Sequence, residues 1–188
     1  MPYTDILSRV SEAIETGAQP QPEPRRHTRP QTRPLSPGAP AAAAPAQWTL
    51  PGFGPMTRIS TSFGEVHAQA LRMRDLVRTQ NGNLKPIQHL DRVMLDQDFT
   101  AQVADATAIV IRAGALGAGL PKQDVVVSPR QEVGIGHHGA GIKWQPAAQL
   151  LGRPGVLRRP EEILTYTMFH CGEPVVVKME GLWARVIP

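Results

Sequence analysis

The 188-residue sequence has little cysteine and no long apolar run. Cys171 is its only cysteine, which excludes an internal disulfide and a cysteine-based zinc cluster. No stretch approaches the roughly 18–20 apolar residues that span a bilayer. The N-terminus carries acidic residues early and lacks the apolar core of a secretion signal. We therefore expect a cytoplasmic protein without a transmembrane segment, and leave open export by a route other than Sec.

Motifs of the common enzyme classes are also missing. The sequence has no Gly-x-Ser-x-Gly elbow, no Walker loop and no paired carboxylates at the end of a strand. The stretch "GALGAG" is followed by Pro121 and a β-branched run rather than by a helix, which argues against a dinucleotide site. His137, His138, His170 and Cys171 fit no zinc spacing, so we expect neither a metal nor a cofactor.

The net charge of +4 is unevenly distributed. Residues 1–16 contribute −2, residues 17–47 contribute +3, and the rest of the chain contributes +3. A nucleic-acid-binding domain normally concentrates basic residues on its folded part. The mild charge of residues 48–188 therefore argues against a specific nucleic-acid partner.

Residues 1–17 predict a short amphipathic helix. Its apolar face, at helical spacing, consists of Ile6, Leu7, Val10, Ala13 and Ile14. Thr4 is a suitable N-cap and Gly17 a stop signal. So short a helix is marginal alone in water, and three surfaces remain open: its own domain, another protein or a membrane interface. The membrane is disfavoured because Arg9 is the one basic residue on the polar face.

Residues 18–47 are rich in proline, alanine and arginine and predict a disordered linker. The prolines favour extended polyproline II over helix or sheet, so the segment is suited to act as a semi-rigid spacer. Its basic residues are Arg25, Arg26, Arg29 and Arg33. They belong to a solvated tether or contact an acidic partner or anionic lipid.

Residues 48–188 predict a compact all-β domain. Short β-branched or alternating runs recur with turns every 8–12 residues, as in "TRISTSFGEV", "ATAIVIRAG", "ILTYTMF" and "PVVVKMEGL". Asn81-Gly82 predicts a hairpin turn between a strand that ends at Val77 and a strand at 86–90. A short helix is expected at "QPAAQLL".

The order of these segments resembles the bacterial Hint domains of the hedgehog/intein family. The resemblance rests on "FGPMTRISTSFGEV", "LRMRDLVRTQNGNLKPI", "IRAGALGAGLPKQDVVVSPRQEV", "QPAAQLL" and "YTMFHCGEPVVVKMEGL" and covers about residues 52–182. It implies a horseshoe-shaped all-β fold with pseudo-twofold related halves. It also implies self-processing, in which a cysteine that opens the domain attacks the preceding carbonyl and a histidine protonates the departing nitrogen.

The resemblance fails at the reactive positions. The nucleophile position falls on Gly52, which has no side chain, and the "Ser-Pro-x-His" stretch falls on Ser128 to Gln131, so a glutamine replaces the histidine. A later family histidine falls on Pro174. Glutamine cannot transfer a proton at neutral pH, and glycine cannot attack. We therefore predict a degenerate Hint domain that is not an enzyme.

Three functions remain open. The first is a protein-binding or assembly module with the N-terminal helix as a tethered docking element. The second is residual autoprocessing near Pro51-Gly52, and the third is binding of an anionic surface or nucleic acid through the linker.

Other side chains have structural interpretations. Cys171 is expected as a small buried core residue, and His67 and His89 at solvent or sheet positions without a catalytic partner. The three tryptophans, Trp48, Trp144 and Trp183, are expected in core or rim packing, or as an interface anchor.

Overall fold

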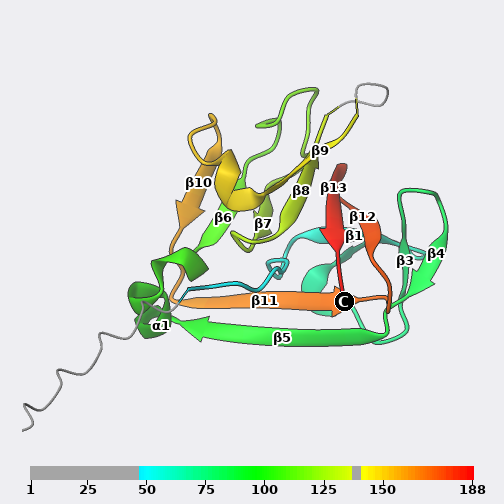
Figure 1. Cartoon of the computed structure of the whole chain (residues 1–188), viewed down its shortest axis with the longest axis horizontal. Helices are drawn as coiled ribbons and strands as arrows, with labels where there is room; N and C mark the ends of the chain where they lie inside the picture. The colour runs from blue at the N-terminus through cyan, green and yellow to red at the C-terminus, as the bar shows by residue number, and fades with distance from the viewer. Residues whose placement is uncertain (1–46, 137–140) are drawn as a thin grey trace, which may run out of the picture. The chain divides into compact units, whose positions relative to one another are not determined.

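The computed structural model describes residues 47–136 and 141–188, and this part of the chain is almost entirely β (Figure 1). Its largest sheet has the order β4-β3-β1-β12-β13-β8-β9, with β2 paired to β1. The strands of this sheet are β1 (Arg58–Thr61), β2 (Gly64–His67), β3 (Leu76–Arg78), β4 (Leu84–Pro86), β8 (Glu132–Ile135), β9 (Lys143–Pro146), β12 (Val175–Met179) and β13 (Leu182–Val186). The predicted all-β class is confirmed.

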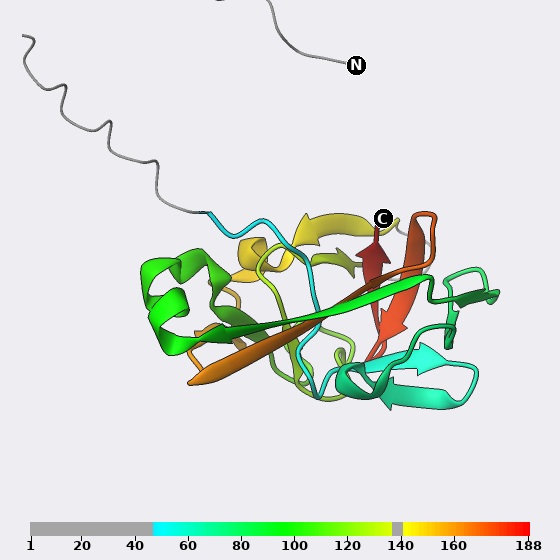
Figure 2. The ribbon, with the colours of Figure 1, turned by 90° about the horizontal axis from the view of Figure 1, so that it is seen from below.

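Two smaller sheets complete the domain. β10 (Val156–Arg159), β6 (Ala108–Ile111) and β7 (Val125–Val127) form a three-stranded sheet, and β5 (His89–Asp96) pairs with β11 (Ile163–His170) as a long ribbon. Figure 2 shows this ribbon crossing the chain segment that enters the domain from Gln47. The helical elements are short: α1 (Gln97–Gln102) and the 3₁₀ turns η1 (Ala68–Ala70), η2 (Ala104–Ala106) and η3 (Ala147–Leu150).

The hairpin predicted at Asn81-Gly82 forms, with shorter strands than expected. Gly82 has a φ of +81°, and its N–H donates to the Thr79 carbonyl at 2.9 Å. A positive φ is readily reached by glycine, which explains the turn. The second strand, β4, ends at Pro86, whereas the sequence predicted a strand over 86–90. Leu90 lies instead in β5, where it pairs with Phe169.

The core forms on both faces of the three-stranded sheet. Ile109 and Ile111 of β6 point into a large cluster with Phe53 and the central strands, while Ala108 and Val110 point into a smaller cluster with Trp48 and Tyr166. The predicted β-branched runs form β6 and β7, and both strands are buried at every position. By contrast, β12 and β13 alternate buried and half-buried residues, so one face of each remains accessible.

Helical structure differs in detail from the prediction. The helix expected at "QPAAQLL" is the 3₁₀ turn η3, which begins directly after Pro146. α1 was not predicted from the sequence. Asp96 caps it by accepting a 2.8 Å hydrogen bond from the Phe99 N–H, and Asp98 lies in its first turn. In the described ranges, no helix is long and apolar enough to cross a membrane.

Candidate functional site

The segment around Gly52 lies between β7 and β11. Phe53 exchanges backbone hydrogen bonds with Thr167 at 2.9 and 2.8 Å, and the Gly54 N–H donates to the Val126 carbonyl at 2.7 Å. The Gly52 carbonyl accepts a 2.9 Å hydrogen bond from the Ser128 N–H. Gly52, which the resemblance places at the family nucleophile, is therefore fixed by strands on both sides.

Space for a side chain at Gly52 is limited. A Cβ atom there would lie 3.0 Å from Cβ of Tyr166 and 3.3 Å from Cγ of Met168. Real Cβ contacts are rarely so short, so even a cysteine requires one of these neighbours to move by a few tenths of an ångström.

Gly52 opens into a cleft of about 470 Å³. The cleft is lined by Leu50, Pro51, Gly52, Phe53, His89, Asp91, Gln131, Met168, Phe169, His170, Arg185, Val186, Ile187 and Pro188. Two of the predicted family positions, Gly52 and Gln131, thus share one cavity. Ser128 contacts the Gly52 backbone without lining the cleft. Pro174 lies outside the lining, at an exposed position between β11 and β12.

The side-chain amide of Gln131 is used in the fold. Gln131 is 1% exposed, and its Nε2 donates to the Arg185 carbonyl at 2.8 Å and to the Glu132 carbonyl at 3.2 Å. The first bond ties the segment after β7 to β13. An amide in this place donates hydrogen bonds to the backbone and has no proton to exchange with a substrate near neutral pH.

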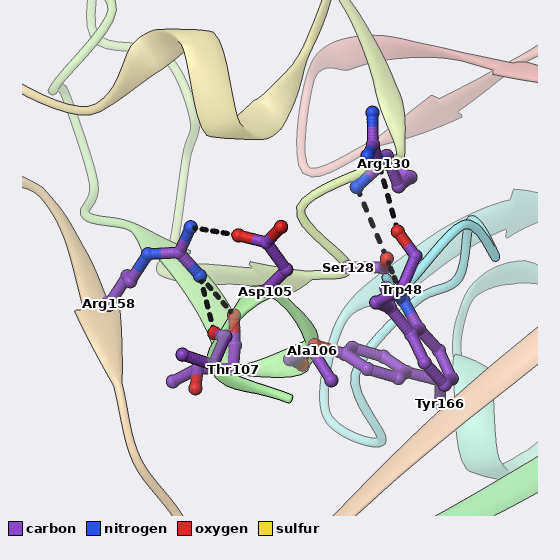
Figure 3. Close-up of polar contacts among 9 residues, drawn as sticks. Trp48, Asp105, Ala106, Thr107, Ser128, Arg130, Arg158 and Tyr166 are labelled. Atoms are coloured by element: carbon purple, nitrogen blue, oxygen red, sulfur yellow. Dashed lines mark hydrogen bonds and ion pairs between the residues drawn. The ribbon is translucent and has the colours of Figure 1, made fainter. Parts of the chain in front are cut away.

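Upstream of Gly52 the chain is held by Ser128 and Arg130 (Figure 3). Ser128 Oγ donates to the Leu50 carbonyl at 2.6 Å and accepts from the Trp48 indole at 3.0 Å. Arg130 Nε donates to the Trp48 carbonyl at 2.9 Å. We call this set, Trp48, Leu50, Ser128 and Arg130, the Trp48 clamp.

Aromatic packing completes the Trp48 clamp. Trp48 is 6% exposed and packs against Tyr166, with ring centroids 5.7 Å apart, and against the edge of Phe99 at 6.2 Å. The Tyr166 hydroxyl donates to the Ala106 carbonyl at 2.9 Å, and burial raises the pKa of this hydroxyl well above its usual value. The hydroxyl therefore stays protonated, and able to donate, at neutral pH.

The cleft also contains two histidines and a carboxylate that sequence reasoning did not bring together. His89 and His170 are directly paired across β5 and β11, and their rings stack with centroids 5.1 Å apart and an interplanar angle of 17°. His170 Nδ1 accepts a 3.2 Å hydrogen bond from the Gly172 N–H. His89 was expected at a solvent or sheet position without a catalytic partner, and it lies exposed in β5. Its stacking on His170 was not predicted. The two histidines meet because of the register between β5 and β11, and a single sequence does not reveal that register.

Cys171 follows His170 but lies outside the cleft. It is 4% exposed and packs in the large core cluster. Burial, followed by the charge of Glu173, raises the pKa of its thiol to about 11, so the reactive thiolate is scarce at neutral pH. Within the described ranges, no three His, Cys, Asp or Glu residues are placed to hold a metal ion. His137 and His138 lie outside those ranges.

The partner-binding candidates of the N-terminal segments lie outside the described residues. This applies to Ile6, Leu7, Val10, Ile14, Arg25, Arg26, Arg29 and Arg33. Their roles stay predictions from the sequence.

Comparison with known proteins identifies the family. A family model, described as Hint domain, matches residues 51–186, and the chain belongs to this family. The resemblance seen in the sequence is thereby confirmed, and with it the relation to self-processing domains. A search of curated protein sequences finds no significant match.

Several solved intein structures are similar to this chain. The gp41-1 intein is 8% identical with a TM-score of 0.46, covering 72% of this chain and 98% of its own. The MchDnaB-1 intein is 8% identical with a TM-score of 0.44, covering 70% and 98%. A DnaB intein from Synechocystis sp. PCC 6803 is 8% identical with a TM-score of 0.45, covering 74% and 100%. At these identities the likeness concerns the fold alone.

Proposed function

We propose that this chain is a catalytically inactive Hint domain that acts as a protein-binding or assembly module. In this proposal residues 48–188 form the Hint domain, residues 18–47 are a spacer, and residues 1–17 are a helix that docks on a protein partner. The module keeps the family scaffold and uses it as a rigid support.

The observation that carries the proposal is the chemistry at Gly52 and Gln131. Formation of a thioester needs a thiolate next to the scissile carbonyl, and departure of the amine needs a proton donor. Gly52 supplies no nucleophile, and Gln131 donates its amide hydrogens to the Arg185 and Glu132 carbonyls. Cys171, buried in the core with a raised pKa, is no substitute.

The Trp48 clamp supports retention of the upstream chain. Self-processing at Pro51-Gly52 would release everything before Gly52, which includes Trp48 and Leu50. Yet Trp48 is almost fully buried and both residues are hydrogen-bonded to side chains of the domain. A segment that stabilises the domain core is suited to remain attached to it.

Residual autoprocessing is the second candidate, and the histidines of the cleft favour it. His89, His170 and Asp91 line the same cavity as Pro51 and Gly52. A water molecule activated by an imidazole can add to the Pro51 carbonyl, and the peptide C–N bond then breaks as the Gly52 nitrogen takes up a proton. The third function, binding of an anionic surface through the arginines of residues 18–47, has only its charge in support.

The intact mass of the full-length chain tests the proposal. The purified protein, untagged at its N-terminus, is incubated with and without dithiothreitol and weighed over several days. We expect the mass of residues 1–188 in both samples. A break at Pro51-Gly52 would contradict inactivity, and a His89→Gln/His170→Gln variant shows whether the imidazoles cause it.

The binding role is tested with the same protein. Cross-linking in the source cells, with the full chain and with a chain that lacks residues 1–16, is followed by identification of the captured proteins. We expect a partner that is retained by the full chain and lost on deletion. A partner that binds equally to both chains would place the docking site outside the N-terminal helix.

A further inference from the structure

A second cavity, of about 700 Å³, lies on the large sheet and shares no lining residue with the cleft at Gly52. We call it the Trp144–Trp183 groove. Its wall is rich in glycine and apolar side chains, and it includes Leu116, Leu120, Lys122, Ile142, Trp144, Lys178 and Trp183.

The two indoles flank a glycine. Gly134 of β8 is paired with Trp183 of β13 on one side and with Trp144 of β9 on the other, so both indoles stand on the same face of the sheet. A Cβ atom at Gly134 would lie 3.1 Å from ring atoms of Trp144 and 2.6 Å from Cγ2 of Ile142. These side chains therefore lie over the glycine backbone and close one end of the groove.

Both indoles remain half-exposed. A half-buried tryptophan offers a large, rigid apolar surface at little entropic cost, which is why tryptophan is enriched in binding hot spots. Here two of them line a concave surface together with the aliphatic side chains of Leu116, Leu120 and Ile142. This combination is suited to hold an apolar side chain of a ligand.

The charge of the groove is positive and not neutralised. Lys178 is paired with Trp183 across β12 and β13, and its Nζ lies 5.8 Å from the centre of the indole ring. Among the described residues, the lining contains Lys122 and Lys178 and no carboxylate. Within the described ranges, neither lysine forms an ion pair.

The neighbouring acids are engaged elsewhere. Both carboxylate oxygens of Glu180 accept hydrogen bonds from Arg58, at 2.5 and 2.9 Å. Glu132 pairs with Arg185 at 2.9 Å, and this guanidinium stacks on Trp144 with its carbon 4.5 Å from the ring centre. The two lysines are thus left to attract an anionic ligand.

We propose that the Trp144–Trp183 groove is the docking site for an acidic peptide segment of a partner protein. Carboxylates of the segment pair with Lys122 and Lys178, and an apolar side chain next to them packs between the indoles. This inference rests on the proposed binding function. Two lysines are few for a phosphate backbone, which is held by many cations, and the aliphatic wall matches a peptide side chain better than a nucleotide.

The test uses the full-length ¹⁵N-labelled chain and a synthetic peptide in which glutamates and aspartates surround a Leu-Phe pair. The control peptide has every acid replaced by its amide. The three indole N–H signals report on three places: Trp144 and Trp183 in the groove, and Trp48 in the core. We expect the acidic peptide, and not its amide form, to shift the two groove signals and to leave the Trp48 signal unchanged. Binding of the acidic peptide should weaken as salt is added.

Charge reversal locates the site. Lys122→Glu/Lys178→Glu is compared with Arg72→Glu/Arg153→Glu, which changes the net charge equally at exposed residues outside the groove. We expect the first variant to bind the peptide about tenfold or more weakly and the second to bind normally. Lys122, Arg72 and Arg153 are exposed and Lys178 is half-buried, and an unchanged Trp48 signal verifies the fold of each variant.

Several outcomes overturn the inference. These are no shift with the acidic peptide, equal shifts with its amide form, equal loss of affinity in both charge variants, or shifts of the groove signals with oligouridylate but not with peptide. The intact mass of the same samples is measured alongside. A cleaved chain defeats the proposed function itself, whereas an intact chain without peptide binding defeats the groove alone.

Discussion

The indole of Trp48 donates a hydrogen bond to Ser128 Oγ over 3.0 Å and so joins residues 80 positions apart in the chain. The same oxygen donates to the Leu50 carbonyl, so a single hydroxyl holds two residues of the segment that precedes Gly52. The stability of the domain should therefore depend on a segment that self-processing would remove.

Loss of the Ser128 hydroxyl should destabilise the domain. Ser128→Ala leaves the buried Trp48 N–H without this partner and removes the hydrogen bond to the Leu50 carbonyl, which we expect to cost about 2–3 kcal/mol of unfolding free energy. Urea denaturation followed by tryptophan fluorescence measures it. Ser62→Ala, at a half-buried serine outside the clamp, is the control and should change stability little. Equal losses of unfolding free energy in the two variants would contradict a stabilising role of the Trp48 clamp.

A carboxylate at position 131 should make stability depend on pH. Gln131→Glu keeps the shape but places an acceptor against the Arg185 and Glu132 carbonyls, which we expect to cost about 3 kcal/mol near neutral pH. Protonation of the carboxyl restores a donor, so the loss should shrink at pH 4. Urea denaturation at both pH values checks this against Gln97→Glu at an exposed position.

A side chain at Gly52 should strain the domain. Gly52→Cys places a Cβ 3.0 Å from Tyr166 and 3.3 Å from Met168, and we expect a loss of about 1–2 kcal/mol in thermal or urea unfolding. The variant Met168→Ala removes one of the two close neighbours. In that background, Gly52→Cys should lower the unfolding free energy by less than it does in the native chain. A cysteine that is accommodated without loss would mean that Tyr166 moves freely.

Cys171 should weaken the fold at alkaline pH. Its thiol pKa rises from 9.0 to about 11 on folding, because burial disfavours the thiolate. The folded state therefore holds the proton more tightly, so this contribution is complete below pH 9 and is lost as the pH rises through 11. Relative to Cys171→Ala, the unfolding free energy of the native chain should fall by about 1.4 kcal/mol for each pH unit in that window. Parallel pH profiles of the two proteins would contradict it.

Local sequence signals were sufficient for much of the fold. The β-branched runs of β6 and β7 and the Asn81-Gly82 turn depend on neighbouring residues, and both were predicted. α1 was missed because its capping residue, Asp96, ends a strand and no apolar periodicity marks the helix.

The site was predictable only where family positions mark it. Gly52 and Gln131, which the resemblance placed at family positions, line one cleft. The Trp48 clamp and the stacked pair of His89 and His170 were not predicted, because each depends on segments far apart in the chain. Pro174, which the resemblance also placed at a family position, does not line the cleft.

The Trp48 clamp is also the first point at which tension on the upstream chain reaches the domain. A pull on the chain upstream of Gln47 reaches Trp48 before it reaches Gly52, and there it meets a buried ring, the Ser128 hydroxyl and the Arg130 guanidinium. The force then passes into the segment after β7 and into the ribbon of β5 and β11 through Tyr166. The Pro51-Gly52 bond follows this anchor in the chain, so we expect tension applied on the N-terminal side to load the anchor before it reaches this bond.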